Sequence, residues 1–134
     1  MDTAVVIPAY QPDEKLPRYA RALLEAGYGR VVVVDDGSGS RFDGVFALLP
    51  AEEPRLTLIR YPVNGGKGVA LRTGMEALLN EPAIAFVLTA DSDGQHTVPD
   101  TLRMAERLHA DPDGLLLGSR DFAQADVPVK SRAG

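Results

Sequence analysis

Residues 31–40 read VVVVDDGSGS, and this stretch decides the class of fold. Four consecutive valines are typical of a strand buried on both faces, because a half-exposed strand would alternate apolar and polar residues. Two carboxylates, Asp35 and Asp36, follow the valines and lead into a glycine–serine turn. In parallel sheets, ligands bind at the carboxyl ends of the strands. The stretch therefore predicts an interior strand whose acidic end lies at a binding edge.

Further apolar runs alternate with helical patterns along the chain. We expect the other strands at residues 4–9, 56–60, 84–89 and 115–117, and helices over residues 14–26, with Gly27 as the stop, and more weakly over 42–49. The apolar stripes of the three main helices are Leu16, Tyr19, Ala20, Leu23 and Leu24; Val69, Ala70, Thr73, Ala77 and Leu78; and Leu102, Ala105, Leu108 and His109, in a helix that opens at Pro99. This alternation predicts an α/β fold, a mostly parallel sheet with helices on both faces.

The composition narrows the classes of function. The chain has 134 residues, a formal net charge of −5, 45% hydrophobic residues and no cysteine, which fits one ordinary globular domain. The acidic balance argues against nucleic-acid binding, and the lack of cysteine excludes disulfides and zinc–thiolate sites. No run approaches the roughly 20 apolar residues of a membrane span, and the N-terminus lacks a signal-peptide pattern. We therefore expect a cytoplasmic chain.

Polar or glycine-rich segments follow each expected strand. Residues 8–12, PAYQP, form a loop after the first strand, and residues 64–68, NGGKG, form a glycine turn that carries Lys67 to the start of a helix. Such a turn can approach an anion closely, although it is not a Walker loop. Taken singly, these segments are also compatible with ordinary turns, and the Asp35–Asp36 pair with a helix cap.

The segment after the fourth strand, residues 91–96, reads DSDGQH. Asp91 and Asp93 are spaced so that both can reach one hard divalent cation, and Gln95 adds a neutral oxygen. Mg²⁺ or Mn²⁺ held by so few protein ligands keeps open positions for a diphosphate. A capped surface turn is the alternative. An EF-hand is excluded, because Leu102 stands where its twelfth-position Glu would be.

In combination and in this order, the motifs resemble a known family. VVIPAYQP (5–12), VVVVDDGSGS (31–40), NGGKGVALRTGM (64–75), TADSDGQHTVPD (89–100) and LLGSRDF (116–122) are similar to the family 2 inverting glycosyltransferases of GT-A fold. Within them, the chain most resembles the polyprenol-phosphate branch, typified by dolichyl-phosphate mannose synthase. The resemblance implies a UDP- or GDP-sugar donor, and an acceptor that is a polyprenyl phosphate such as a dolichyl or undecaprenyl lipid.

The resemblance also implies roles for individual residues. It places Pro8, Ala9, Tyr10, Asp35 and Asp36 around the base and ribose, and Lys67 beside the nucleotide. Asp91 and Asp93 match the Asp-x-Asp metal motif for Mg²⁺ or Mn²⁺, and Gln95 matches a Gln of the metal shell. Asp93 and Arg120 are the expected catalytic residues, and Arg120 and Arg132 match arginines near the phosphates of donor and acceptor. No matched position supplies a general base, which an anionic lipid phosphate would not need.

The length departs from that family. Its catalytic domain runs on for about another hundred residues, which build the acceptor side. We therefore expect residues 1–134 to be a single, truncated N-terminal part of the enzyme, which binds the nucleotide-sugar and transfers the sugar only weakly. We expect the parent protein to lie at the cytoplasmic face of a membrane. The alternatives are a soluble family 2 enzyme acting on a saccharide hydroxyl, a sugar-phosphate nucleotidyltransferase, and an inactive nucleotide-binding fragment.

Overall fold

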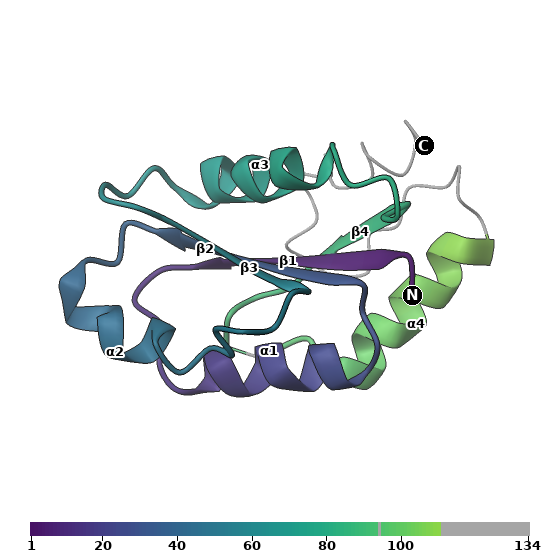
Figure 1. The fold of residues 1–134 in the computed structure, drawn as a ribbon, viewed down its shortest axis with the longest axis horizontal. Helices are drawn as coiled ribbons and strands as arrows, with labels where there is room; N and C mark the ends of the chain where they lie inside the picture. The colour runs from purple at the N-terminus through teal and green to yellow at the C-terminus, as the bar shows by residue number, and fades with distance from the viewer. Residues whose placement is uncertain (94, 111–134) are drawn as a thin grey trace.

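A four-stranded parallel sheet forms the centre of the protein (Figure 1). A computed structural model describes residues 1–93 and 95–110. The strands are β1 (Thr3–Ala9), β2 (Arg30–Asp36), β3 (Leu56–Tyr61) and β4 (Phe86–Thr89), in the spatial order β3-β2-β1-β4. The parallel α/β fold expected from the sequence is confirmed. The expected strand at residues 115–117 lies outside the described residues.

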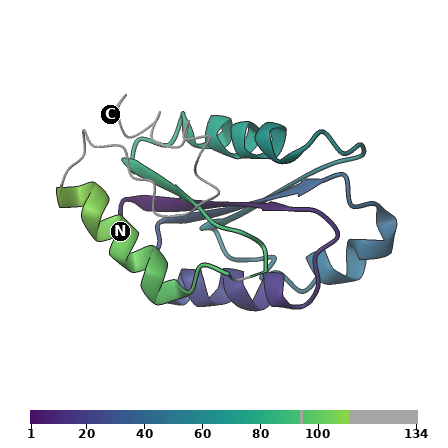
Figure 2. The ribbon, with the colours of Figure 1, turned by 180° about the vertical axis from the view of Figure 1, so that it is seen from behind.

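Helices cover both faces of this sheet, as Figures 1 and 2 show from opposite sides. Helix α3 (Lys67–Leu78) packs on one face. Helices α1 (Lys15–Glu25) and α4 (Val98–Ala110) lie on the other, together with the short α2 (Asp43–Phe46) and the 3₁₀ turn η1 (Ser40–Phe42). Two apolar clusters result. Val31 and Val33 pack toward α1, and Val32 and Val34 pack toward α3.

The period-two alternation of β2 separates the two carboxylates at its end. Asp35 continues the side of Val31 and Val33, and Asp36 continues the side of Val32 and Val34. In the register of the sheet, Asp35 lies between Ala9 of β1 and Arg60 of β3. The carboxyl ends of the strands therefore meet at one edge, with adjacent acidic residues directed to opposite faces.

Besides His109, which is exposed on α4, two details of the expected packing are wrong. Helix α3 does not bury Val69 or Ala77, which are exposed, and its buried side consists of Ala70, Gly74 and Leu78. The expected stripe was misplaced because glycine was not counted as a core residue. Residue Gly74 nevertheless lies so close to β1 that a Cβ atom there would be 2.5 Å from Val6 Cγ1.

The second error concerns β3, which is a half-exposed strand. Its apolar run suggested burial on both faces, yet β3 lies at an edge of the sheet, and Leu58 is 39% exposed. Strand β4 also begins at Phe86, two residues later than expected, because the Ile84 N–H closes a turn on the Glu81 carbonyl and Ala85 lies between that turn and the strand. Helix α1 matches its expected stripe, and Gly27 follows it with a φ of 102°.

Candidate functional site

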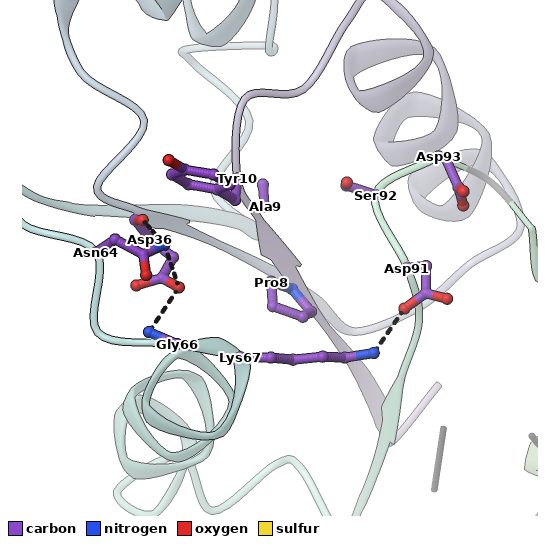
Figure 3. Close-up of a pocket in the computed structure, with 10 residues that line it drawn as sticks. All are labelled: Pro8, Ala9, Tyr10, Asp36, Asn64, Gly66, Lys67, Asp91, Ser92 and Asp93. Carbon is purple, nitrogen blue, oxygen red and sulfur yellow. Dashed lines mark hydrogen bonds and ion pairs between the residues drawn. The ribbon is translucent and has the colours of Figure 1, made fainter. Parts of the chain in front are cut away.

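A cavity of about 500 Å³ lies at the carboxyl edge of the sheet (Figure 3). Tyr10 and Asp36 lie at one end of it, and the turn after β4, residues 91–93, which we call the acidic turn, lies at the other. The Lys67 side chain runs between the two ends. The lining residues are Pro8, Ala9, Tyr10, Asp36, Asn64, Gly66, Lys67, Asp91, Ser92 and Asp93. Segments far apart in the sequence thus form one site, as the parallel-sheet topology predicts.

The Asp36 carboxylate holds the glycine turn against the sheet. It accepts hydrogen bonds from the Gly65 N–H at 2.8 Å, the Gly66 N–H at 3.0 Å and the Asn64 side-chain amide at 3.1 Å. Asp36 is 4% exposed, so these three donors compensate the loss of water around the carboxylate. The backbone N–H groups of the glycine turn, which we expected to face an anion, are in part directed to Asp36.

Gly37 is the position at which this packing requires glycine. Its φ is 73°, and a Cβ atom there would stand 2.3 Å from the Asn64 backbone nitrogen. Only glycine combines that backbone conformation with so close an approach. The turn after β2 and the turn after β3 are therefore in direct contact beside the cavity.

Asp35 lies outside the cavity lining. Its carboxylate accepts the Ser38 N–H at 3.0 Å and pairs with Arg60 Nε at 2.8 Å. Arg60 also pairs with Asp43 at 2.8 Å and lies 4.6 Å from the centre of the Phe46 ring. The hydrogen bond to Asp35 raises the pKa of the Arg60 guanidinium further. Sequence reasoning missed Arg60, although its place beside Asp35 in a parallel register was the available signal.

The acidic turn presents hard oxygen donors at the other end of the cavity. Asp91 Oδ1 pairs with Lys67 Nζ at 3.1 Å, and Asp93 Oδ1 accepts the Gln95 N–H at 3.0 Å. Among residues 1–93 and 95–110, no group of three or more His, Cys, Asp or Glu side chains is placed to hold a metal. Asp91 and Asp93 both line this end of the cavity, and carboxylate oxygens are the ligands that hard divalent cations prefer.

Tyr19 connects helix α1 to the segment that follows the acidic turn. Its hydroxyl donates to the main-chain carbonyl of His96. Burial, and to a smaller extent the negative charges of nearby groups that include Asp91 and Asp93, raises the pKa of Tyr19, so the phenol stays protonated and remains a donor. The segment that follows the acidic turn is thereby anchored to helix α1.

The structure brings most of the expected site residues together. Pro8, Ala9, Tyr10, Asp36, Lys67, Asp91 and Asp93 all line the cavity. Asp35 and Gln95 do not belong to the lining, although Gln95 is exposed next to it. Arg120 and Arg132 lie outside the described residues. Asn64 is a lining residue whose contact with Asp36 sequence reasoning did not anticipate.

Comparisons with known proteins identify the family of the chain. The sequence model of glycosyl transferase family 2 matches residues 4–134, and the chain belongs to that family. An uncharacterized protein of Methanocaldococcus jannaschii is 32% identical over 97% of this chain and 52% of its own length. A dolichyl-phosphate beta-glucosyltransferase of Trichomonas vaginalis is 30% identical over 72% of this chain and 32% of its own. The chain thus spans about half or less of these relatives.

A solved structure supports the fold assignment. The mannosyltransferase PcManGT of Pyrobaculum calidifontis, in complex with GDP-Man and Mn²⁺, superimposes with a TM-score of 0.63 at 26% identity, over 83% of this chain and 33% of that one. The chain therefore has the GT-A-like fold of glycosyltransferases. The family assignment favours this reading over the sugar-phosphate nucleotidyltransferase alternative.

Among the helices of residues 1–93 and 95–110, none combines the length and apolar character that a bilayer crossing requires.

Proposed function

We propose that this chain forms the donor-binding part of a metal-dependent, inverting glycosyltransferase that binds a UDP- or GDP-sugar and transfers the sugar to a polyprenyl phosphate. One observation carries the proposal: a single cavity joins a side suited to a nucleoside, at Tyr10 and Asp36, to an acidic turn suited to a cation. A nucleoside diphosphate has this same polarity, with a base and ribose at one end and anionic oxygens at the other.

At the nucleoside end, Pro8, Ala9 and Tyr10 supply apolar surface and Asp36 supplies acceptor oxygens. Tyr10 is 52% exposed, which leaves its ring accessible for stacking on a base. Asp36 can accept from a base or ribose donor with the lone pairs that its three protein donors leave. Asp35 supports this end of the site from outside the cavity.

At the diphosphate end, charge determines the chemistry. Negative charge grows on the departing diphosphate when the bond to the anomeric carbon breaks, and a Mg²⁺ or Mn²⁺ ion held there would stabilise it. Asp91 and Asp93 would hold the cation, Gln95 would join them, and Lys67 would contribute a further positive charge. Arg120 and Arg132 are proposed to contact phosphates, on the basis of the family resemblance.

The nature of the cavity carboxylates favours a phosphate acceptor. Within the described lining, Asp36 already accepts three hydrogen bonds, and Asp91 and Asp93 are the proposed cation ligands. We assign these three carboxylates to the nucleoside and the cation, whereas a phosphate oxygen is already anionic and needs no general base. The name of the Trichomonas relative, a dolichyl-phosphate glucosyltransferase, supports the same class of acceptor. The location of the parent protein at the cytoplasmic face of a membrane is proposed on the basis of the family resemblance.

Titration of the chain with UDP-glucose and with GDP-mannose, with and without Mn²⁺, tests the donor site. We expect one donor to bind in a Mn²⁺-dependent manner, and we expect this binding to be lost in Asp93→Ala. Glu106→Ala removes an exposed carboxylate of α4 and serves as the control for charge. Failure of both donors to bind the original chain would contradict the proposal and favour an inert fragment.

A transfer assay tests the acceptor. The chain would be incubated with Mn²⁺ and the donor that it binds, in one reaction with a short polyprenyl phosphate and in a parallel reaction with a saccharide acceptor. We expect the lipid phosphate to be preferred and transfer by residues 1–134 to be slow, since the resemblance assigns the acceptor side to later residues. Preferred transfer to the saccharide hydroxyl would contradict the proposed acceptor.

A further inference from the structure

A strained residue lies directly beside the nucleoside end of the cavity. Gln11 has a φ of 50°, and among residues 1–93 and 95–110 it is the only non-glycine residue with a positive φ. This left-handed conformation is unfavourable for a residue with a Cβ atom, so it persists only where surrounding contacts enforce it. Gln11 follows Tyr10, and the two side chains also contact each other, with Gln11 Nε2 at 3.3 Å from the Tyr10 hydroxyl.

The contact that holds this backbone comes from the turn after β2. The Gln11 N–H donates to Ser38 Oγ at 2.8 Å, across 27 residues of sequence. Ser38 is 8% exposed, so water competes little for this bond. The loop that carries Tyr10 is thus attached to the neighbouring strand's loop by a serine hydroxyl.

Ser38 is itself held by the ion pair of Asp35 and Arg60, which lies outside the cavity. Its N–H donates to Asp35 Oδ1 at 3.0 Å, and Arg60 Nε donates to Asp35 Oδ2 at 2.8 Å. Asp35 is 1% exposed, and a buried carboxylate of this kind makes strong, charge-assisted hydrogen bonds. A continuous chain of contacts therefore runs from β3 through Arg60, Asp35 and Ser38 to Gln11.

We propose that Ser38 is a positioning residue of the donor site, which holds Gln11 in its strained conformation and thereby sets the place of Tyr10 at the cavity. Asp35 and Arg60 support Ser38. The inference rests on the proposed function in one respect, that the cavity binds a nucleotide. It assigns to the buried Asp35 an indirect part in binding, in place of the direct contact that the family resemblance implied.

Hydrogen exchange tests the contact without any ligand. We expect Ser38→Ala to accelerate amide exchange at Gln11 by at least about tenfold, because its N–H loses the acceptor. Ser40→Ala, which removes an exposed hydroxyl of the same segment, is the matched control and is expected to leave this rate unchanged. Unchanged exchange at Gln11 in Ser38→Ala would overturn the proposal.

Nucleotide binding tests the consequence. With Mn²⁺ present, we expect Ser38→Ala to weaken binding of UDP or GDP, whichever binds the original chain, by about fivefold, while Ser40→Ala stays within about twofold. An affinity equal to that of the original chain would overturn the inference and leave the proposed function standing. Failure of the original chain to bind either nucleotide would instead be a failure of the proposed function.

A second variant separates positioning from general loosening of the fold. Glycine adopts a positive φ without the penalty of a Cβ atom, so Gln11→Gly needs less support from Ser38. We expect Ser38→Ala to cost less affinity in the Gln11→Gly background than in the original chain, a coupling that a double-mutant cycle measures. Equal losses in both backgrounds would overturn the proposed route through Gln11.

Discussion

Lys67 and Asp91 form an ion pair across the cavity, and both side chains have a second partner in the proposed donor complex. The Nζ–Oδ1 distance is 3.1 Å, and the side chains are 48% and 22% exposed. An ion pair this accessible to water contributes little to stability. Its components are therefore available to exchange partners, Asp91 for a cation and Lys67 for a diphosphate.

Lys67→Ala tests this exchange. We expect binding of the nucleoside diphosphate in the presence of Mn²⁺ to weaken by roughly tenfold, or about 1.4 kcal/mol, because one charge-assisted contact is lost. Binding of Mn²⁺ alone is expected not to weaken, since Asp91 loses a competing cation. Calorimetric titration measures both affinities, and Lys15→Ala, at the exposed start of α1, is the control. Weaker Mn²⁺ binding would contradict the exchange.

For individual residues, the sequence predicted which ones lie together at the carboxyl edge of the sheet, but it did not predict the contacts that each one makes there. The order of the strands places Tyr10, Lys67, Asp91 and Asp93 at one edge, and the cavity confirms that grouping. Asp35 and Asp36 are indistinguishable in the sequence, because a run of four valines has no polar face that would tell which carboxylate turns toward α3. Only the packing of the helices decides that Asp36 lines the cavity.

Among the elements, α3 shows what a pattern of apolar residues leaves out. Its buried side includes Gly74, where a Cβ atom would stand 2.5 Å from Val6 Cγ1 and 3.2 Å from Val34 Cγ2. Close approach of a helix to a sheet needs a small residue, and such a residue carries no apolar signal. The phase of α3 was therefore mispredicted, whereas α1, which packs with large side chains, was predicted correctly.

Substitutions in α3 test this account of its packing. We expect Gly74→Ala to lower the free energy of unfolding by about 1–2 kcal/mol, because crowding against Val6 outweighs the gain in helix propensity. Gly68→Ala, in the same helix, places its Cβ in open space and is expected to be neutral or slightly stabilising. Urea unfolding of both variants measures the difference. Equal stability of the two would show that α3 can move away from the sheet without cost.

The C-terminal end of α4 is tied to the N-terminal segment by His109. One ring nitrogen lies 2.7 Å from the Ala105 carbonyl and the other 2.6 Å from Asp2 Oδ1. Both partners are acceptors, so the doubly protonated ring satisfies both. The hydrogen bond to Ala105, with a further contribution from Asp2, therefore raises the pKa of His109 above its ordinary 6.5.

The raised pKa of His109 determines the direction in which the free energy of unfolding changes with pH. A group that binds its proton more tightly in the folded state stabilises the fold below about pH 6.5, and this stabilisation is lost as the pH rises through the folded-state pKa. With the His109 side chain 41% exposed, we expect less than about 1 kcal/mol. Asp2→Asn should reduce the loss of unfolding free energy between pH 6 and 8, while Glu106→Gln should not. An unchanged pH profile in Asp2→Asn would contradict the assignment.

For the whole molecule, the distribution of charge leads us to expect that donor binding depends on a cation. The chain carries a formal net charge of −5, and the cavity lining contains three carboxylates and one ammonium group. A nucleoside diphosphate is itself an anion, and it would meet Asp91 and Asp93 at its most negative end. Without a cation between them, like charges at short range oppose binding.

Thermal unfolding of the whole chain measures the dependence of nucleotide binding on the cation. A ligand at 100 times its dissociation constant stabilises the folded state by about 2.7 kcal/mol, which for a chain of this size raises Tm by roughly 10 °C. We expect UDP or GDP to produce such a shift with Mn²⁺ and almost none with EDTA. Inorganic diphosphate with Mn²⁺ should give a smaller shift, because it leaves Tyr10 and Asp36 without a nucleoside. Equal shifts with Mn²⁺ and with EDTA would mean that Lys67 alone compensates the charge, and the acidic turn would then need another role.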